Sequence, residues 1–438
     1  MNISNIKPFR FLEFINLIIF SFILIISGMG ILRISTFFTI FIIPIYILIT
    51  QLVLKEFALI RIDPSLFKKK YFLFPFIVLN LFCALYFPIA ISYKYIEYAD
   101  GLVYFFKIIL LYICGFSLNF RRSTFPSSLI CLSIVSGGIL TTYLSVLQGA
   151  SNIGISNYQL ASRKVIHFWS GELVNGPAMD MLNFFGLSLF PFIIESLISL
   201  VDKKRSRSKL LSIINIVNLT FSSILFCLSL YSALSLLSRT SFVCLFGSGL
   251  IYVVHKLIVI KVSFKYVLNY GLSILSITII IIFCLQFIVA EQFANSLSAL
   301  AIVERFGTES LETPRYILWL IMLTDMWNYP FGGRLVPLSP ENYAHNLWLD
   351  VAFDVGILPM FLLVFFHLMH VRHFYKIFTS NSYKSLGTLV ICFTVAIFAA
   401  FLGTPVLQAS PDYFAITCFF MGLLTGLSER YNKTNILE

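Results

Sequence analysis

Apolar runs long enough to cross a bilayer recur along the chain. A transmembrane helix needs roughly 20 mainly apolar residues to cover the hydrocarbon layer. About twelve such runs are present by this measure, at 11–32, 34–54, 71–91, 102–119, 125–147, 178–200, 210–237, 240–260, 266–290, 346–369, 385–403 and 413–427. The recurrence predicts an all-α polytopic membrane protein with about twelve transmembrane helices. We expect residues 1–438 to form a single integral membrane domain.

Charged residues make up only 12% of the chain, about half the share of a soluble domain. Most Lys and Arg residues fall in alternate loops, which predicts that these loops and both termini are cytoplasmic. This bias explains the net charge of +11 without nucleic acid, since no basic groove with interleaved aromatic residues appears. The first run is too long, and too closely followed by a second, for a cleaved signal peptide. The basic stretches are 55–70, 121–122, 202–209, 256–265 and 372–384.

Neither cysteines nor histidines indicate a metal site. All 8 cysteines fall inside predicted spans without CxxC spacing, so we interpret them as small buried residues. His367, His370 and His373 recur every third residue near the end of the tenth run. We interpret them as cations favoured at a helix C-terminus. We therefore expect no disulfide, no metal and no cofactor.

Two predicted outward loops, 148–177 and 291–345, are longer than their neighbours. Loops of this length are usually functional or disordered, and the second is too apolar for disorder. Its segment "TPRYILWLIMLTDMW" (313–327) predicts a helix with Thr313 as N-cap and Pro314 in the first position. The helix is too short to span, so we expect it along the outer membrane surface or folded back over the spans.

Arginines accumulate beside these loops, on the side where basic residues are otherwise scarce. Arg239 lies at the hairpin between two apolar runs, and Arg315 falls in the first helical turn, where the helix dipole disfavours a cation. An anion would balance such arginines most simply. For Arg305 and Arg334, snorkelling to the interface or pairing with a nearby glutamate (304, 309 or 312) is an equal alternative. The outward arginines are Arg163, Arg239, Arg305, Arg315 and Arg334.

The segment "AHNLWLDVAFDVG" (344–356) introduces polar residues at the start of the tenth run. If that span begins at Asn346, then Asn346, Asp350 and Asp354 share one helical stripe that reaches roughly 12 Å down it. Carboxylates are costly in lipid, so the stripe should face the bundle interior or a water-filled cavity, with His345 at its rim. A polar helix entry, with Asn as the cap and Asp favoured by the dipole, is the simpler alternative.

The segments "PRYILWLIMLTDMWNYPFGG" and "AHNLWLDVAFDVGILPMF" together resemble the signature of the O-antigen polymerase and ligase superfamily. The chain and the family share an Arg-led helix, a turn with Asn, Pro and two glycines, and then His-Asn before a span. "LSRTSF" (237–242) resembles the family's Ser-Arg span start, and 163–177 is a looser match to its first outward loop. Pro359 stands where the family often has Gly. The resemblance covers roughly residues 160–365.

The resemblance implies a type-C glycosyltransferase of the bacterial inner membrane, with its active site facing the periplasm. Its substrate would be an oligosaccharide on undecaprenyl pyrophosphate, and its partners membrane lipid and a chain-length regulator protein. Arginines suit the pyrophosphate leaving group, and a sugar hydroxyl needs a base with a pKa near neutrality. We assign His345 as base, Asp350 as its orienter and Glu172 as the rival base. The substrate-binding set is Arg163, Arg239, Arg305, Arg315 and Asn346.

Several activities fit this pattern. A polymerase joins repeat units, whereas a ligase moves the finished chain to the lipid A core, and their sequences hardly differ. We favour the polymerase because idiosyncratic loops suit a unique repeat unit. A flippase or transporter would also explain the hydropathy, but such proteins tend to show related halves, and none are visible here. A membrane O-acyltransferase also uses a His near an Asn, but it would leave the arginines unexplained.

Overall fold

The computed structural model describes residues 7–29, 32–54, 58–62, 64–118, 125–153, 164–171, 173–201, 209–236, 238–259, 315–338, 343–379 and 384–434. Within these ranges the regular elements are helices, apart from one two-stranded sheet and one isolated β-bridge between Ile60 and Leu118. Nine helical segments of the described ranges are long and apolar enough to cross a membrane. The predicted class, an all-α polytopic membrane protein, is therefore confirmed.

The first half of the chain contributes long helices and one short β-hairpin. Its elements are α1 (Lys7–Gly28), α2 (Leu32–Phe37), the π-helix η2 (Phe38–Ile42), α3 (Ile43–Leu54), the 3-10 helix η4 (Pro64–Lys68), α4 (Lys70–Ser92), α5 (Tyr98–Ser117), α6 (Phe125–Ile153), β1 (Lys164–Ile166), β2 (Leu173–Asn175), α8 (Gly176–Ser188), α9 (Phe190–Val201), α10 (Lys209–Ser235) and α11 (Arg239–Val259). The strands pair antiparallel, with Val165 opposite Val174.

The described residues from 315 onward contain three long helices and several short ones. Its elements are α14 (Arg315–Asp325), the 3-10 helix η5 (Met326–Asn328), α15 (Leu347–Val355), α16 (Ile357–Thr379), α17 (Lys384–Gly403), α18 (Val406–Ala409) and α19 (Pro411–Thr434). Most predicted spans correspond to one helix. The predicted span 178–200 is divided between α8 and α9, and the predicted span 266–290 lies outside the described residues.

Helices α5 and α19 pack closely through small residues. A Cβ placed on Gly115 would overlap the carbonyl of Phe419, and one on Gly422 would overlap the carbonyl of Tyr112. Backbones can approach this closely only where a side chain is missing, as is common between membrane helices. This contact fixes α19 along most of its length.

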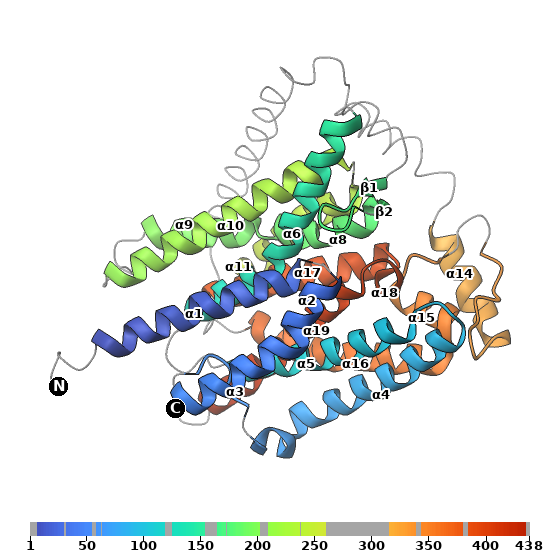
Figure 1. The fold of residues 1–438 in the computed structure, drawn as a ribbon, viewed down its shortest axis with the longest axis horizontal. Helices are drawn as coiled ribbons and strands as arrows, with labels where there is room; N and C mark the ends of the chain where they lie inside the picture. Colours follow the sequence, from blue (N-terminus) through green and yellow to red (C-terminus); the bar gives the residue numbers. More distant parts are fainter. Residues whose placement is uncertain are drawn as a thin grey trace.

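The long helices run roughly along the longest axis of the molecule (Figure 1). Helix α1 begins and helix α19 ends at the left of the view, which we call the terminal end. Helices α14, α15 and α18 lie at the right, which we call the α14 end. Helix α14 lies across that end instead of running along the bundle, as expected for a short apolar helix folded back over the spans.

The predicted span 346–369 is wrong as a single helix. The chain reverses at Gly356, where φ is +102°. Nε1 of Trp348, at the start of α15, donates a 3.0 Å hydrogen bond to Nδ1 of His367, well inside α16. In one straight helix these residues would be about 28 Å apart, so α15 must fold back alongside α16. We call this unit (347–379) the α15–α16 hairpin.

Candidate functional site

The start of α15 is built by its own polar side chains. Asn346 is the N-cap, and its side-chain oxygen accepts a 3.3 Å hydrogen bond from the amide of Leu349. The carboxylate of Asp350 accepts hydrogen bonds from the amides of Ala344 (2.8 Å) and Asn346 (2.9 Å). These bonds close a loop around His345, whose φ of 54° lies in the left-handed region. The alternative of an Asn-capped helix entry is therefore confirmed.

The predicted polar stripe is buried, but its direction is reversed. Asn346, Asp350 and Asp354 all point inward, as expected. Because α15 runs antiparallel to α16, Asp354 is near the α14 end, and the loop of His345 lies deeper, about 15 Å along α16 from its start. The expectation that His345 stands at the rim is therefore wrong. His345 is half-buried, beside the inner end of α15.

The two bonds to Asp350 also bear on its predicted role as orienter of the His345 ring. Both carboxylate oxygens bind main-chain amides on either side of His345, so these bonds orient the backbone at that residue. Asn346, assigned to substrate binding, uses its side-chain oxygen for the cap. The catalytic roles of these residues stay predictions.

Arg334 pairs with Asp354, whereas the three glutamates suggested as its partners lie outside the described residues. Its Nε lies 2.8 Å from one carboxylate oxygen of Asp354, and the amide of Gln408 on α18 binds the other. The guanidinium stacks on Tyr95, 3.8 Å from the ring centre, and lies 5.2 Å from that of Tyr343. Burial alone would lower the pKa of Arg334, but the carboxylate of Asp354 outweighs it and raises that pKa.

Main-chain contacts join the turn 329–334 to the end of α15. The amide of Gly333 donates to the carbonyl of Asp354 at 3.0 Å, and that of Ile357 donates to the carbonyl of Pro330 at 3.0 Å. Gly332 has a φ of +73°, and a Cβ on it would lie 2.6 Å from the amide nitrogen of Gly356. Two glycines thus let the backbones touch. The turn with Asn, Pro and two glycines, quoted as a motif, holds the reversal of the hairpin.

Helix α14 also contacts the loop of His345. Nε1 of Trp319 donates a 2.8 Å hydrogen bond to the carbonyl of Ala344, the residue before His345. Arg315 is the first residue of α14, which confirms its place in the first turn. It precedes Trp319 by four positions, so both lie on one face of the helix. Thr313 and Pro314, predicted to start this helix, lie outside the described residues.

Arg315 also meets the start of α11. A Cβ placed on Gly403 would lie 3.4 Å from Nη1 of Arg315 and 3.5 Å from Oγ1 of Thr240. Thr240 follows Arg239, the first residue of α11. The backbone therefore brings two of the predicted substrate-binding arginines, Arg239 and Arg315, to one place. Arg163, Glu172 and Arg305 lie outside the described residues, and so do 154–163 and 291–314 of the two predicted loops.

The first predicted loop is attached to the bundle through its β-hairpin. Nε1 of Trp169 donates to Oγ1 of Thr141 at 2.9 Å, and the amide of Phe168 donates to Oγ of Ser145 at 2.9 Å. Both acceptors are on α6. The β-hairpin is at the α14 end in Figure 1.

The three histidines of α16 are buried among aromatic rings. His367 accepts from Trp348, and Nδ1 of His370 lies 2.7 Å from the carbonyl of Phe366. His373 packs edge-on against Tyr71. The effect of the helix dipole is confined to the last turn, and α16 continues to Thr379, so the interpretation of these residues as cations at a helix end is wrong. Among the described residues, no group of three His, Cys, Asp or Glu side chains is placed to hold a metal.

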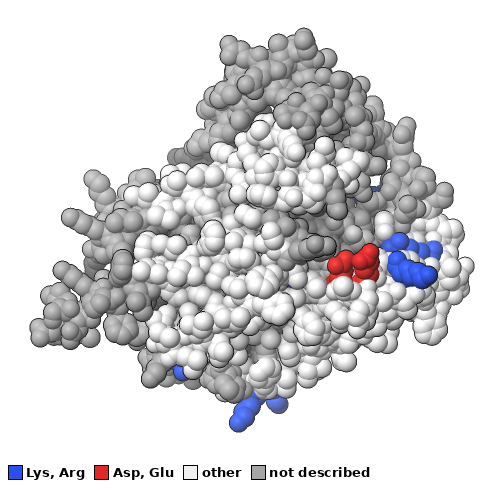
Figure 2. Space-filling view, in the orientation of Figure 1, with Lys and Arg blue, Asp and Glu red and all other residues white. Residues whose placement is uncertain are grey.

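Charge is unevenly spread over the face drawn in Figure 2. Acidic side chains form one patch toward the α14 end, and Lys and Arg side chains lie just beside it (Figure 2). Most of the remaining described surface on this face is uncharged. Uncharged surface along the helices suits lipid, and charge at one end suits an aqueous boundary.

Sequence reasoning missed three residues that support this site. Trp319, Gln408 and Tyr95 come from three separate segments, and each contacts the α15 unit or Arg334. Only Trp319 lay in a quoted motif. Comparison of the sequence with models of known protein families and with curated proteins gives no match.

Proposed function

We propose that this protein is an O-antigen polymerase of the superfamily that its motifs resemble. It would join oligosaccharide repeat units carried on undecaprenyl pyrophosphate. The observation that carries the proposal is that α14 contacts two places: Arg315 lies beside the start of α11, and Trp319 binds the loop of His345. One short helix thus links the proposed cationic site to the loop that holds the candidate base.

The arginines provide the anion-binding half of the site. A pyrophosphate leaving group needs its developing charge neutralised, and the fixed fork of donors in Arg suits phosphate oxygens. Arg239 and Arg315 each begin a helix, and a helix N-terminus favours an anion at the same place. The arrangement explains why cations stand where a helix dipole would otherwise disfavour them.

His345 provides the proton-accepting half of the proposed site. A sugar hydroxyl is too weakly acidic to attack alone, and an imidazole titrates near neutrality. The carboxylate of Asp350 accepts hydrogen bonds from the amides on both sides of His345 and so fixes the backbone there. The point from which the imidazole ring projects is therefore defined. Glu172 remains the rival base.

The proposed topology has about twelve transmembrane helices and cytoplasmic termini, with the α14 end in the periplasm. Two observations support it. Helix α1 begins and helix α19 ends at the same end of the bundle (Figure 1), and the sequence shows the Lys and Arg bias described above. The protein would lie in the bacterial inner membrane, beside a chain-length regulator.

The test is deletion of the gene in its native host, read on a lipopolysaccharide gel. A polymerase mutant still transfers one repeat unit to the lipid core, so core plus one repeat is the expected result. Bare core with long chains retained on the lipid carrier would contradict the proposal and identify a ligase. Purified protein in vesicles should lengthen a lipid-linked repeat. Transport of an unmodified repeat, without lengthening, would identify a flippase.

A further inference from the structure

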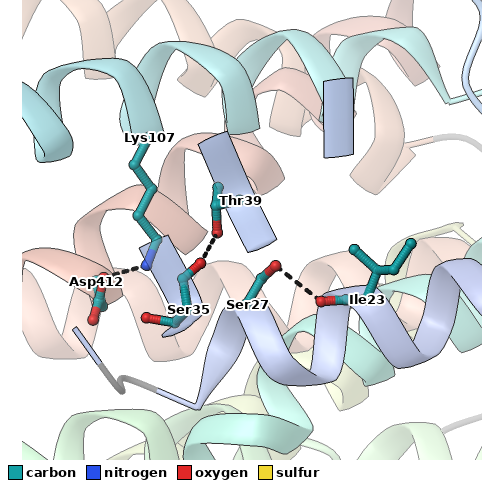
Figure 3. A network of polar contacts seen from close by, with 6 residues as sticks. All are labelled: Ile23, Ser27, Ser35, Thr39, Lys107 and Asp412. Carbon is teal, nitrogen blue, oxygen red and sulfur yellow. Dashed lines mark hydrogen bonds and ion pairs between the residues drawn. The ribbon is translucent and has the colours of Figure 1, made fainter. Parts of the chain in front are cut away.

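Lys107 is a buried cation inside a membrane-spanning helix. It lies in the middle of α5, a candidate span, and its side chain is 2% exposed. Its Nζ lies 2.6 Å from a carboxylate oxygen of Asp412 at the start of α19 (Figure 3). A charge at such a place is costly, and its partner is the first clue to its role.

The pair lies beside the π-helix η2. Figure 3 shows Lys107 and Asp412 next to Ser35 and Thr39. The Thr39 hydroxyl donates to the carbonyl of Ser35 at 2.7 Å, within its own segment. A π-turn is rare and often marks a functional site. Here the π-helix η2 lies beside Lys107, the charged residue in the middle of α5.

A short chain of contacts links this pair to the candidate site. The amide of Ser410 donates to the carbonyl of Val406, and that of Tyr413 to the carbonyl of Ser410, so α18 and the start of α19 form one hydrogen-bonded unit. Gln408 of α18 binds Asp354, which in turn binds Arg334. Displacement of Asp412 would therefore change the contacts of Asp354 at the end of α15.

We propose that Lys107 is a positioning residue for the α15–α16 hairpin. By holding Asp412 it fixes the start of α19, and through α18 it keeps Gln408 on Asp354. Buried ion pairs add little net stability compared with apolar pairs, so the role of this pair is geometric. The effect on activity rests on the proposed function, whereas the effect on the hairpin does not.

The first experiment is hydrogen exchange at residues 333–334 in purified Lys107→Met and Lys256→Met variants. Lys256 is the matched control, because it forms another buried pair, 2.5 Å from Glu195, between α11 and α9. We expect Lys107→Met to speed exchange of the Gly333 and Arg334 amides, which donate to the carbonyls of Asp354 and Phe353, by at least about tenfold, since local opening sets their protection. Lys256→Met should leave them unchanged. Unchanged exchange in Lys107→Met, or equal change in both variants, would overturn the proposal.

The second experiment measures polymerisation of a lipid-linked repeat. In Lys107→Met, kcat should fall about tenfold or more while KM for the donor stays within about twofold, because donor contacts remain and alignment is lost. The exchange of partners in Lys107→Asp with Asp412→Lys should restore much of kcat. A loss confined to the amount of folded protein would mean a merely structural role. If the wild type makes no polymer, the proposed function fails, and hydrogen exchange alone decides the positioning role.

Discussion

Nε1 of Trp319 donates a 2.8 Å hydrogen bond to the carbonyl oxygen of Ala344, so α14 is tied to the residue that precedes His345. The bond joins the Arg-led helix to the His-containing loop, two motifs separated by an intervening turn. Its loss should change the relative position of the arginine and the histidine without removing either.

Trp319→Phe tests this link. The ring stays apolar and the donor is lost, which leaves the carbonyl of a buried residue unpaired, at about 1–3 kcal/mol. We expect polymer synthesis to fall about tenfold while the protein still inserts. Trp327→Phe is the control, because Nε1 of Trp327 donates only within its own segment, to the carbonyl of Leu323. Equal activity of the two variants would show that the link is dispensable.

His345→Asn tests the base. Asn tolerates the positive φ at this position better than Ala, so the loop should keep its shape. Loss of a general base typically lowers the rate by about 10²–10⁴, so polymer should disappear from gels. Glu172→Gln, measured in parallel, should retain activity. The reverse pattern would assign the base to Glu172.

Arg315→Lys tests pyrophosphate binding. The charge remains but the fork of donors is lost, so activity should fall at least about tenfold with normal insertion. Arg372→Lys, an exposed position toward the terminal end of α16, should be silent. Full activity of both variants would remove Arg315 from the site.

Gly332→Ala tests the close backbone contact. The added Cβ would meet the amide of Gly356 at 2.6 Å, and the φ of +73° is strained for alanine. We expect a loss of about 1–3 kcal/mol in the free energy of unfolding, measured by circular dichroism during denaturation. Gly249→Ala is the control, because open space surrounds that helical position. It should be neutral or slightly stabilising. A similar loss in both variants would contradict the explanation.

The spans were predictable because lipid imposes one length and one polarity on any helix that crosses it. The reversal at Gly356 was not, because the apolar run 346–369 continues through the glycine without a change in hydropathy. The fold-back of α15 depends on the contacts of Gly332 with Gly356 and of Pro330 with Ile357, which hydropathy does not reveal.

Partners at a distance were the least predictable part of the site. The burial of Asp350 and Asp354 followed from their spacing and from the cost of charge in lipid. The pairing of Arg334 with Asp354 did not, since glutamates at a similar distance in the sequence were equally plausible partners. Gln408 gave no signal, since a lone glutamine near a span end is ordinary. Lys107 did give one, as a cation inside an apolar run.

The fold-back of α15 also bears on how the membrane crossings of the chain are counted. Gly333, in the turn 329–334, touches Asp354 at the end of α15, so the chain is at the same level at these two points. The stretch between them therefore adds no crossing. The parity of crossings on either side of it is independent of α15, so reporters fused near Leu335 and at Gly356 should report the same compartment.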